Sequence, residues 1–294
     1  MVATLALAAA RPALAAARPL LVTSARSTLP LMALTPSKFA AAGTWAAWAA
    51  YCGVVLFSEG GIAPGNSALH TEPETIQSAL GLSLNFWFVL PTIAPTLAPV
   101  LDPALEAFFN VLICYALCFF GFVADERENE YSGGMVPYLT GALFLTNVFY
   151  LPMLALRTPR AGADLANAQA APFTPLQSLA EIKWLAGIVG VVVPLLAVGW
   201  FGCARPDVIA PGFETRAANL VHAITTDRLA FSFATDYLVF WAFQGVLVGA
   251  DAARRGVDAD SPSVAAARFV PFVGLVSWLL MRPSLPSDDA AGTS

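Results

Sequence analysis

The sequence predicts an all-α, polytopic membrane protein, a bundle of about six transmembrane helices with one segment interrupted by prolines. Of its 294 residues, 57% are hydrophobic and 12% charged, whereas a soluble domain has about 45–50% apolar and about 25% charged residues. The mean hydropathy is +0.68. Several apolar runs reach about 20 residues, the length that crosses the hydrocarbon core of a bilayer. The partner that this composition requires is therefore the lipid bilayer.

Residues 1–35 have the composition of a removable targeting segment, and residues 36–284 are expected to form one membrane-embedded domain. The segment contains arginines, many alanines and no acidic residue, because the first acid in the chain is Glu59. This composition is typical of an organelle transit peptide. Its prolines would break the amphipathic helix of a mitochondrial presequence, so a plastid (chloroplast) membrane is favoured. The mitochondrial inner membrane and, through a signal-peptide core at residues 2–10, the endomembrane system are the alternatives.

The first predicted span covers residues 39–58, an alanine-rich run with aromatic side chains three residues apart at Trp45, Trp48 and Tyr51. Residues 59–79 contain glycines, prolines and acids but no Lys or Arg. This composition is typical of an aqueous loop.

A proline-interrupted segment comes next. Residues 79–90 read as a helix, but prolines then recur at every fourth position: Pro91, Pro95, Pro99 and Pro103. One proline kinks a helix, and four in succession argue against a continuous one. We expect residues 91–101 to be broken, re-entrant or interfacial, which membrane depth tolerates only where protein or a water-filled cavity surrounds the backbone.

Five further spans are predicted from apolar runs: residues 104–124, 135–156, 184–203, 229–250 and 264–281. Pro194 is expected to kink the third of these. Two long loops, residues 158–180 and a stretch carrying Arg205, Arg216 and His222, connect them, and residues 285–294 are expected to be a disordered tail. No internal repeat is visible, so the inverted-repeat pattern of many secondary transporters is missing from the sequence.

The membrane orientation does not follow from these spans. One side collects Lys38, Arg127, Arg205, Arg216, Arg228 and Arg282, and the other Arg157, Arg160, Lys183, Arg254 and Arg255. With six basic residues on one side and five on the other, the positive-inside rule favours neither orientation.

Asp236 is the leading candidate for a functional residue. An ionisable group within a span costs about 2.5–3.5 kcal/mol on insertion scales and is a functional hypothesis by default. Ser232 and Gln244 lie four residues before and eight after it, on the same helical face. This polar stripe predicts a proton, cation or substrate site; the alternative is an interhelical hydrogen bond that holds the bundle together.

Three further polar residues within spans could face the same interior: Asn147, Glu106 and Asn110. The alternative for Asn147 is a role in helix packing. The alternative for Glu106 is a position at the membrane interface, where the helix dipole favours an acid. Asp227 and Arg228 are expected to be an exposed cap and interface anchor.

Residue types exclude several classes of protein. The two histidines, His70 and His222, lie in predicted loops, which argues against di-iron desaturases, bis-His haem and intramembrane serine proteolysis. The two lysines, Lys38 and Lys183, lie at span edges, so a retinal Schiff base is not expected. The sequence has no Gly-rich phosphate-binding loop of the GxxxxGK type, and because it has no extended basic cluster, nucleic acid is not an expected partner.

No metal or cofactor is required by the sequence. Cys114 and Cys118 share a helical face, but no third ligand lies near them in the sequence. The aspartates at 251, 258 and 260 lack the spacing of a magnesium site, and we expect them in a solvated loop. Neutral side chains such as Asn110, Asn147 and Gln244 are able to ligate chlorophyll, yet the light-harvesting pattern is not matched.

Two classes of function remain. The leading hypothesis is a non-enzymatic plastid membrane protein, either a transporter of a small solute or ion that uses Asp236 as its coupling acid or an assembly or structural subunit of a membrane complex. The alternative is a lipid- or isoprenoid-modifying enzyme that uses Glu106 and Asp236 as its acid and base. The substrate, orientation and oligomeric state do not follow from the sequence.

Overall fold

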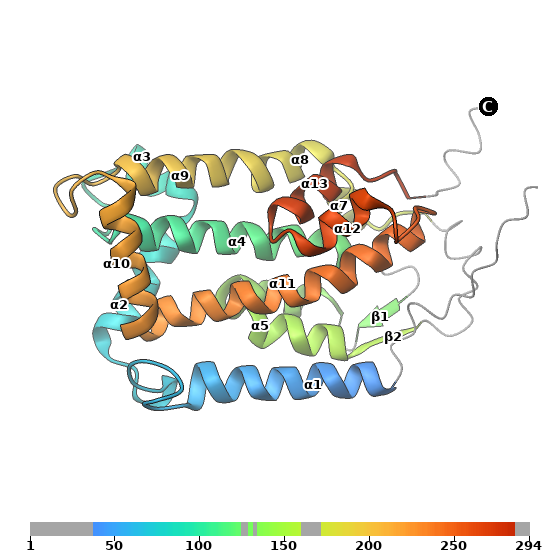
Figure 1. Cartoon of the computed structure of the whole chain (residues 1–294), viewed down its shortest axis with the longest axis horizontal. Helices are drawn as coiled ribbons and strands as arrows, with labels where there is room; N and C mark the ends of the chain where they lie inside the picture. The colour runs from blue at the N-terminus through green and yellow to red at the C-terminus, as the bar shows by residue number, and fades with distance from the viewer. Residues whose placement is uncertain (1–37, 125–128, 132–133, 160–171, 286–294) are drawn as a thin grey trace, which may run out of the picture. The chain divides into compact units, whose positions relative to one another are not determined.

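The computed structural model describes residues 38–124, 129–131, 134–159 and 172–285. The regular elements of this part of the chain are helices, apart from one pair of three-residue strands (Figure 1). The predicted targeting segment and residues 286–294 of the predicted tail lie outside the described residues, so both remain predictions.

The helices form a single bundle, and the elements succeed one another along the chain in the following order. The first half of the chain forms α1 (Lys38–Cys52), its π-helical continuation η2 (Gly53–Phe57), η3 (Ala68–His70), α2 (Pro73–Leu84), η4 (Phe86–Phe88), α3 (Val89–Ile93), α4 (Pro103–Val123), β1 (Asn129–Tyr131), α5 (Val136–Ala155) and β2 (Arg157–Pro159). The second half forms α7 (Pro175–Ala180), α8 (Lys183–Gly187), η5 (Ile188–Val192), α9 (Val193–Cys203), α10 (Phe213–Thr226), α11 (Arg228–Arg254), α12 (Pro262–Phe269) and α13 (Val273–Met281).

Five helices have the length and composition of membrane spans: α1 with η2, α4, α5, the continuous α8–η5–α9 helix, and α11. By length and composition alone, the pair formed by α2 and the η4–α3 helix, bent by 46° at Asn85, counts as a sixth. The predicted bundle of about six helices with a broken segment is confirmed, and the chain is a multi-pass membrane protein.

Local sequence explains where the main helices begin. Asp102 accepts hydrogen bonds from the Ala104 and Leu105 amides, and Pro103 occupies the first turn of α4, where its missing N–H costs nothing. Asp227 caps α11 in the same way through the Ala230 amide. Pro194 has no N–H to offer Gly190, and the preceding residues form the π-helical turn η5.

The helix α5 reverses direction at its centre. Leu145 and Thr146 leave helical geometry, with Thr146 at φ 25° and ψ −105°. A Cβ placed on Gly141 would lie 2.4 Å from the Phe149 ring, although eight residues of straight helix span about 12 Å. The strands that flank α5 pair with each other in antiparallel register. Both ends of α5 therefore lie at one end of the bundle, and the predicted crossing at residues 135–156 is a re-entrant hairpin.

The prediction of a continuous last span over residues 264–281 is also wrong. It is divided into α12 and α13 at Val270–Phe272, where Pro271 interrupts the backbone and Phe272 has a φ of 55°. The break lies beside Gln244 of α11, whereas Arg282 beyond α13 returns to Asp251 near the end of α11. This segment is a second re-entrant hairpin that enters from the same end as α5.

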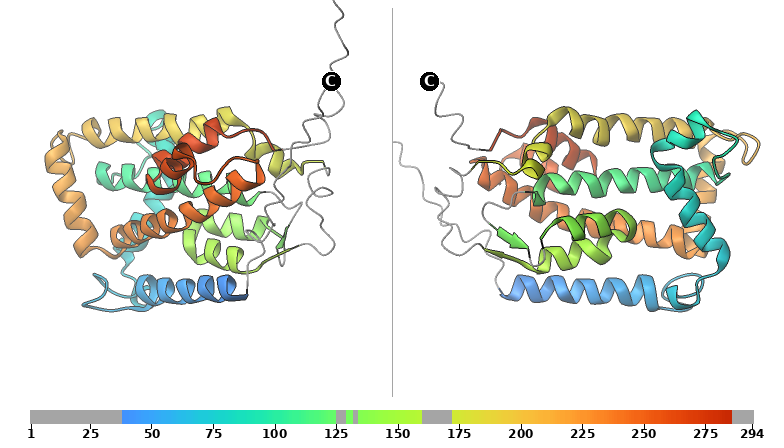
Figure 2. Two further views of the ribbon diagram at one scale, coloured as in Figure 1. Left: turned by 45° about the vertical axis from the view of Figure 1, so that its right-hand side comes forward. Right: turned by 180° about the vertical axis from the view of Figure 1, so that it is seen from behind.

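The predicted loop before α11 contains a helix that sequence analysis missed. It is α10, which runs across the end of the bundle where α11 begins (Figures 1 and 2). Its Phe213 and Val221 side chains are exposed. An amphipathic helix in this position is typical of the membrane interface.

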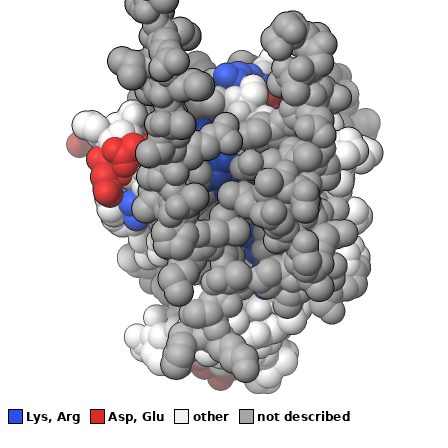
Figure 3. Space-filling view, turned by 90° about the vertical axis from the view of Figure 1, so that its right-hand side faces the viewer, with Lys and Arg blue, Asp and Glu red and all other residues white. Residues whose placement is uncertain are grey.

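The two re-entrant hairpins change which basic residues lie on each side of the membrane. We call the end where α1 begins and α11 ends the hairpin end, and the opposite end the α10 end. Described basic residues near the hairpin end are Lys38, Arg157, Lys183, Arg254, Arg255 and Arg282, and those near the α10 end are Arg205, Arg216 and Arg228. Lys and Arg side chains are visible on the hairpin end in Figure 3. Six against three predicts that this end faces the cytoplasmic side of the membrane, or its organelle equivalent.

Candidate functional site

Asp236 lies at the meeting point of three membrane segments. Its side chain on α11 is 3% exposed. Its Oδ1 atom accepts a hydrogen bond from the Tyr51 hydroxyl of α1 at 2.8 Å and one from Asn147 Nδ2 of α5 at 2.7 Å. The structure thus brings together two of the predicted site residues, Asp236 and Asn147. Sequence reasoning missed Tyr51, for which the only signal was its place in the aromatic series of the first span.

The reversal of α5 is what brings Asn147 to this position. Asn147 directly follows Thr146, the most distorted residue of the break. The break frees backbone groups that a helix would pair, and one of them, the Val148 carbonyl, accepts a hydrogen bond from Trp48 Nε1 at 3.0 Å. Helix α1 therefore holds both the hairpin tip and, through Tyr51, the acid that the tip contacts.

The charge balance at Asp236 is unusual. Within the described part of the chain, its hydrogen-bond partners are neutral donors and it takes part in no ion pair. A buried carboxylate without a positive partner is costly in a low-dielectric environment. The arrangement is suited to an acid whose charge is balanced by a proton or by a cation that binds and leaves.

Glu106 lies in a different cluster. It is in the first turn of α4, as the dipole argument expected, but its side chain is fully buried. Arg205 reaches it with Nε at 3.0 Å from Oε2, and Trp200 Nε1 donates to the same oxygen at 2.8 Å. Asn85 donates to Oε1 at 2.5 Å and, like Arg205, to the Pro99 carbonyl. Glu106 thus fastens the proline-interrupted segment to α4 and α9, and it shares none of these partners with Asp236.

Asn110 supports the same segment. Its Oδ1 accepts from the Trp87 amide at 2.6 Å, and its Nδ2 donates to the Glu106 carbonyl at 2.9 Å. Trp87 and Phe88 both have left-handed backbone geometry, which is costly for bulky residues. Asn110 supplies a partner for an amide that this geometry removes from regular helix pairing.

The predicted polar stripe of α11 serves two hairpins rather than one site. Ser232 donates to the Leu229 carbonyl of its own helix. Gln244 donates to the Ala267 and Val270 carbonyls and accepts from the Phe272 amide and the Tyr115 hydroxyl. Gln244 therefore pairs the backbone at the tip of the α12–α13 hairpin, while Asp236 contacts the tip of α5.

Asp251 is not in a solvated loop, as the sequence predicted, but is 1% exposed. Helix α11 continues beyond the apolar run to Arg254. Asp251 accepts from Arg254 at 3.1 Å, Arg255 at 2.9 Å, Arg282 at 3.2 Å and Trp278 Nε1 at 2.8 Å. A second acid, Glu181, also pairs with Arg255 and Arg282. The three- and four-residue spacing of Asp251, Arg254 and Arg255 was the available signal.

Two arginines at the α10 end are structural, contrary to the prediction of loop and interface positions. Arg216 is fully buried and donates to the carbonyls at the end of α9, including those of Phe201 and Ala204. Arg228 is 9% exposed and donates to carbonyls of the η2 turn and the following loop. Each guanidinium satisfies carbonyls that a helix end leaves unpaired.

Residues that could hold a metal are not grouped together in the described part of the chain. No set of three or more His, Cys, Asp or Glu side chains has the required proximity there. Cys114 and Cys118 are buried within α4 as free thiols. Comparisons with protein-family models, with curated proteins and with solved structures gave no significant match to this chain.

Proposed function

We propose that this multi-pass protein is a carrier of a small solute or ion and that Asp236 binds the proton that drives or accompanies transport. The observation that carries the proposal is a buried acid at the tip of a re-entrant hairpin, hydrogen-bonded only to neutral partners within the described residues. Transporters commonly place coupling sites where helices are discontinuous within the membrane.

The depth of the site supports this function. Asp236 follows Arg228, the first residue of α11, by eight residues, which corresponds to about 12 Å along the helix. The acid is therefore inside the bilayer rather than at its surface. A proton held there has neutral hydroxyl and amide groups around it, which are able to donate both to a carboxylate and to the carbonyl of a carboxylic acid.

The competing hypothesis is an assembly or structural subunit in which Asp236 only joins α1, α5 and α11. The two hypotheses make different predictions for Asp236→Asn. Asparagine keeps the carbonyl that accepts from Tyr51 and Asn147 but binds no proton, so a carrier loses pH-dependent flux while its abundance is unchanged. A purely structural acid would change abundance or thermal stability without a specific transport defect.

A test that needs no known substrate is infrared difference spectroscopy of the reconstituted protein between two pH values. We expect a carboxylic acid C=O band that depends on pH and disappears in Asp236→Asn. Ser232→Ala is the matched control on α11, because that hydroxyl bonds only its own helix. A spectrum with no pH-dependent band assignable to Asp236 would contradict the proposal.

The enzyme alternative requires Glu106 as its second acid. Glu106 is ion-paired with Arg205 and accepts two further side-chain hydrogen bonds, so both of its carboxyl oxygens are engaged by groups of the protein itself. A group held in this way is suited to a permanent structural role, whereas acid–base catalysis requires a second group that gains and loses a proton. The observed geometry therefore favours transport over a reaction that uses both acids.

We further propose a plastid membrane as the location, on the composition of residues 1–35. Cell fractionation followed by N-terminal sequencing of the mature protein tests this. A new N-terminus between about Ala25 and Ser37 in plastid membranes is expected from a transit peptide. Recovery from endomembranes with cleavage near Ala15 or Ala17 would contradict it.

A further inference from the structure

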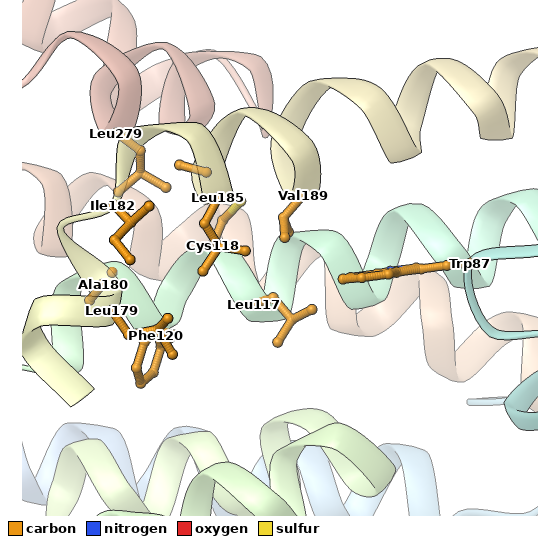
Figure 4. A pocket seen from close by; sticks show the side chains of 12 residues that line it. Trp87, Leu117, Cys118, Phe120, Leu179, Ala180, Ile182, Leu185, Val189 and Leu279 are labelled. Carbon is orange, nitrogen blue, oxygen red and sulfur yellow. The ribbon is translucent and has the colours of Figure 1, made fainter. Parts of the chain in front are cut away.

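An apolar cavity opens within the bundle near its hairpin end. Its volume is about 180 Å³, and its walls come from α4, the α7–α8–η5 stretch and α13. Figure 4 shows Leu117 and Cys118 on one side, Leu185 and Val189 opposite them, and Trp87 toward the far end. The cavity is separate from Asp236, whose partners lie on α1 and α5.

The cavity lies beside tight helix contacts rather than in a loosely packed region. A Cβ on Gly121 of α4 would lie 2.8 Å from Leu279, and one on Gly190 of η5 would lie 2.6 Å from Val276. Helix α13 therefore packs closely on both neighbours next to the open space. The π-helical turn η5 contributes Val189 to the wall, and such turns occur frequently at functional sites.

The chemistry of the wall selects the kind of occupant. Apart from the Cys118 thiol and the Trp87 indole N–H, the side chains that line the cavity are hydrocarbon. A polar solute would find almost no hydrogen-bond partners there, and its desolvation would be uncompensated. A hydrocarbon chain is the occupant that matches this lining.

An exposed lysine lies beside the cavity at the hairpin end. Lys183 is exposed, directly follows the lining residue Ile182, and has no ion pair within the described part of the chain. The nearby acid Glu181 is already paired with Arg255 and Arg282. Trp184, which follows Lys183, is 67% exposed. A lysine next to an exposed tryptophan is typical of the level of the lipid headgroups.

We propose that this cavity binds an acyl chain of an anionic membrane lipid, with the lipid headgroup on Lys183. The basic residues of the hairpin end predict that it faces the leaflet in which anionic lipids are enriched. The charge of Lys183 and the apolar lining of the cavity thus favour the same ligand. The proposal is independent of the proton-binding role of Asp236.

The first test uses the full chain reconstituted in phosphatidylcholine vesicles that contain a minority of phosphatidylglycerol, followed by native mass spectrometry. We expect phosphatidylglycerol to remain bound in preference to phosphatidylcholine. Lys183→Gln should lower its retention about five-fold, the effect of one basic side chain at a membrane surface. Lys38→Gln is the matched control, because Lys38 begins α1 at the same end and α1 contributes none of the described residues that line the cavity.

The second test locates the acyl chain. Bromine atoms on the acyl chain of phosphatidylglycerol should quench the fluorescence of Trp87. The brominated lipid should therefore quench the tryptophan fluorescence of the wild-type protein more strongly than that of Trp87→Phe. No bound lipid, equal retention of both lipids, or equal losses in Lys183→Gln and Lys38→Gln would overturn the headgroup assignment. Equal quenching in wild type and Trp87→Phe would overturn the assignment of the chain to this cavity.

Discussion

Asp236 and Asp251 lie on the same helix and are both almost completely buried, yet their surroundings differ. Asp251 is surrounded by three guanidinium groups and an indole N–H. Asp236 contacts a phenol, an amide and the Thr146 hydroxyl, which are all neutral. A buried carboxylate that is matched by arginines is fixed as an anion and holds structure. One that is matched only by neutral donors is free to exchange its charge, and this difference separates the structural acid from the proposed functional one.

The two acids also hold different hairpins in different ways. Asp251 fixes the base of the α12–α13 hairpin, through Trp278 of α13 and Arg282 just beyond it. Asp236 contacts the tip of α5 through Asn147. An ion-paired base resists movement, whereas a tip held by neutral hydrogen bonds is weaker and easier to rearrange. The comparison assigns the α12–α13 hairpin to the scaffold and the α5 hairpin to the proposed transport site.

The largest expected effect comes from Asp251→Asn. The substitution leaves Arg254, Arg255 and Arg282 with one fewer carboxylate in a buried cluster, and breaking such a pair costs about 3–5 kcal/mol. We expect a marked loss of folded protein and a lower thermal midpoint, measured by size-exclusion chromatography and thermal denaturation in detergent.

Asp258→Asn is the control for this change, because it removes the same charge from the loop that follows α11. It should leave the thermal midpoint unchanged. If Asp251→Asn were as stable as Asp258→Asn, the cluster would not be structural and the contrast with Asp236 would fail.

Gly141→Ala should have the next largest effect. The added Cβ would lie 2.4 Å from the Phe149 ring, so the two halves of α5 could not pack as they do. Overpacking of this kind costs about 1–3 kcal/mol. Because Asn147 lies at the hairpin tip, we expect the Asp236 carboxyl band to change as well, measured by the same infrared experiment.

Gly134→Ala is not a suitable control, because Gly134 has a positive φ. Gly199→Ala is suitable, because a Cβ there meets no neighbour within 4 Å. An Asp236 band that is unchanged in Gly141→Ala would show that the hairpin does not shape the site.

Sequence reasoning located the membrane segments and the polar residues within them, because hydropathy depends only on neighbouring residues. It did not predict the reversal of α5, since Leu145 and Thr146 carry no proline or glycine signal. The α12–α13 break did have such a signal in Pro271. Asp251 was misplaced because the apolar run ends at Ala250, whereas the helix continues to Arg254. The pairing of Glu106 with Arg205 depends on the tertiary fold and leaves no local pattern.

The smallest effect is expected for Tyr51→Phe, which removes the phenol that donates to Asp236 Oδ1 and leaves the aromatic packing of α1 in place. One hydrogen bond contributes about 1 kcal/mol to stability, far less than the Asp251 cluster. The protonated carboxyl should keep its band but absorb at a higher frequency, because its C=O loses a donor. Trp48→Phe is the matched control on the same helix, since it removes a donor to the Val148 carbonyl and not to the acid. A frequency that shifts equally in both variants would mean that α1 acts on Asp236 only by holding the α5 tip, and Tyr51 would then have no direct part in the site.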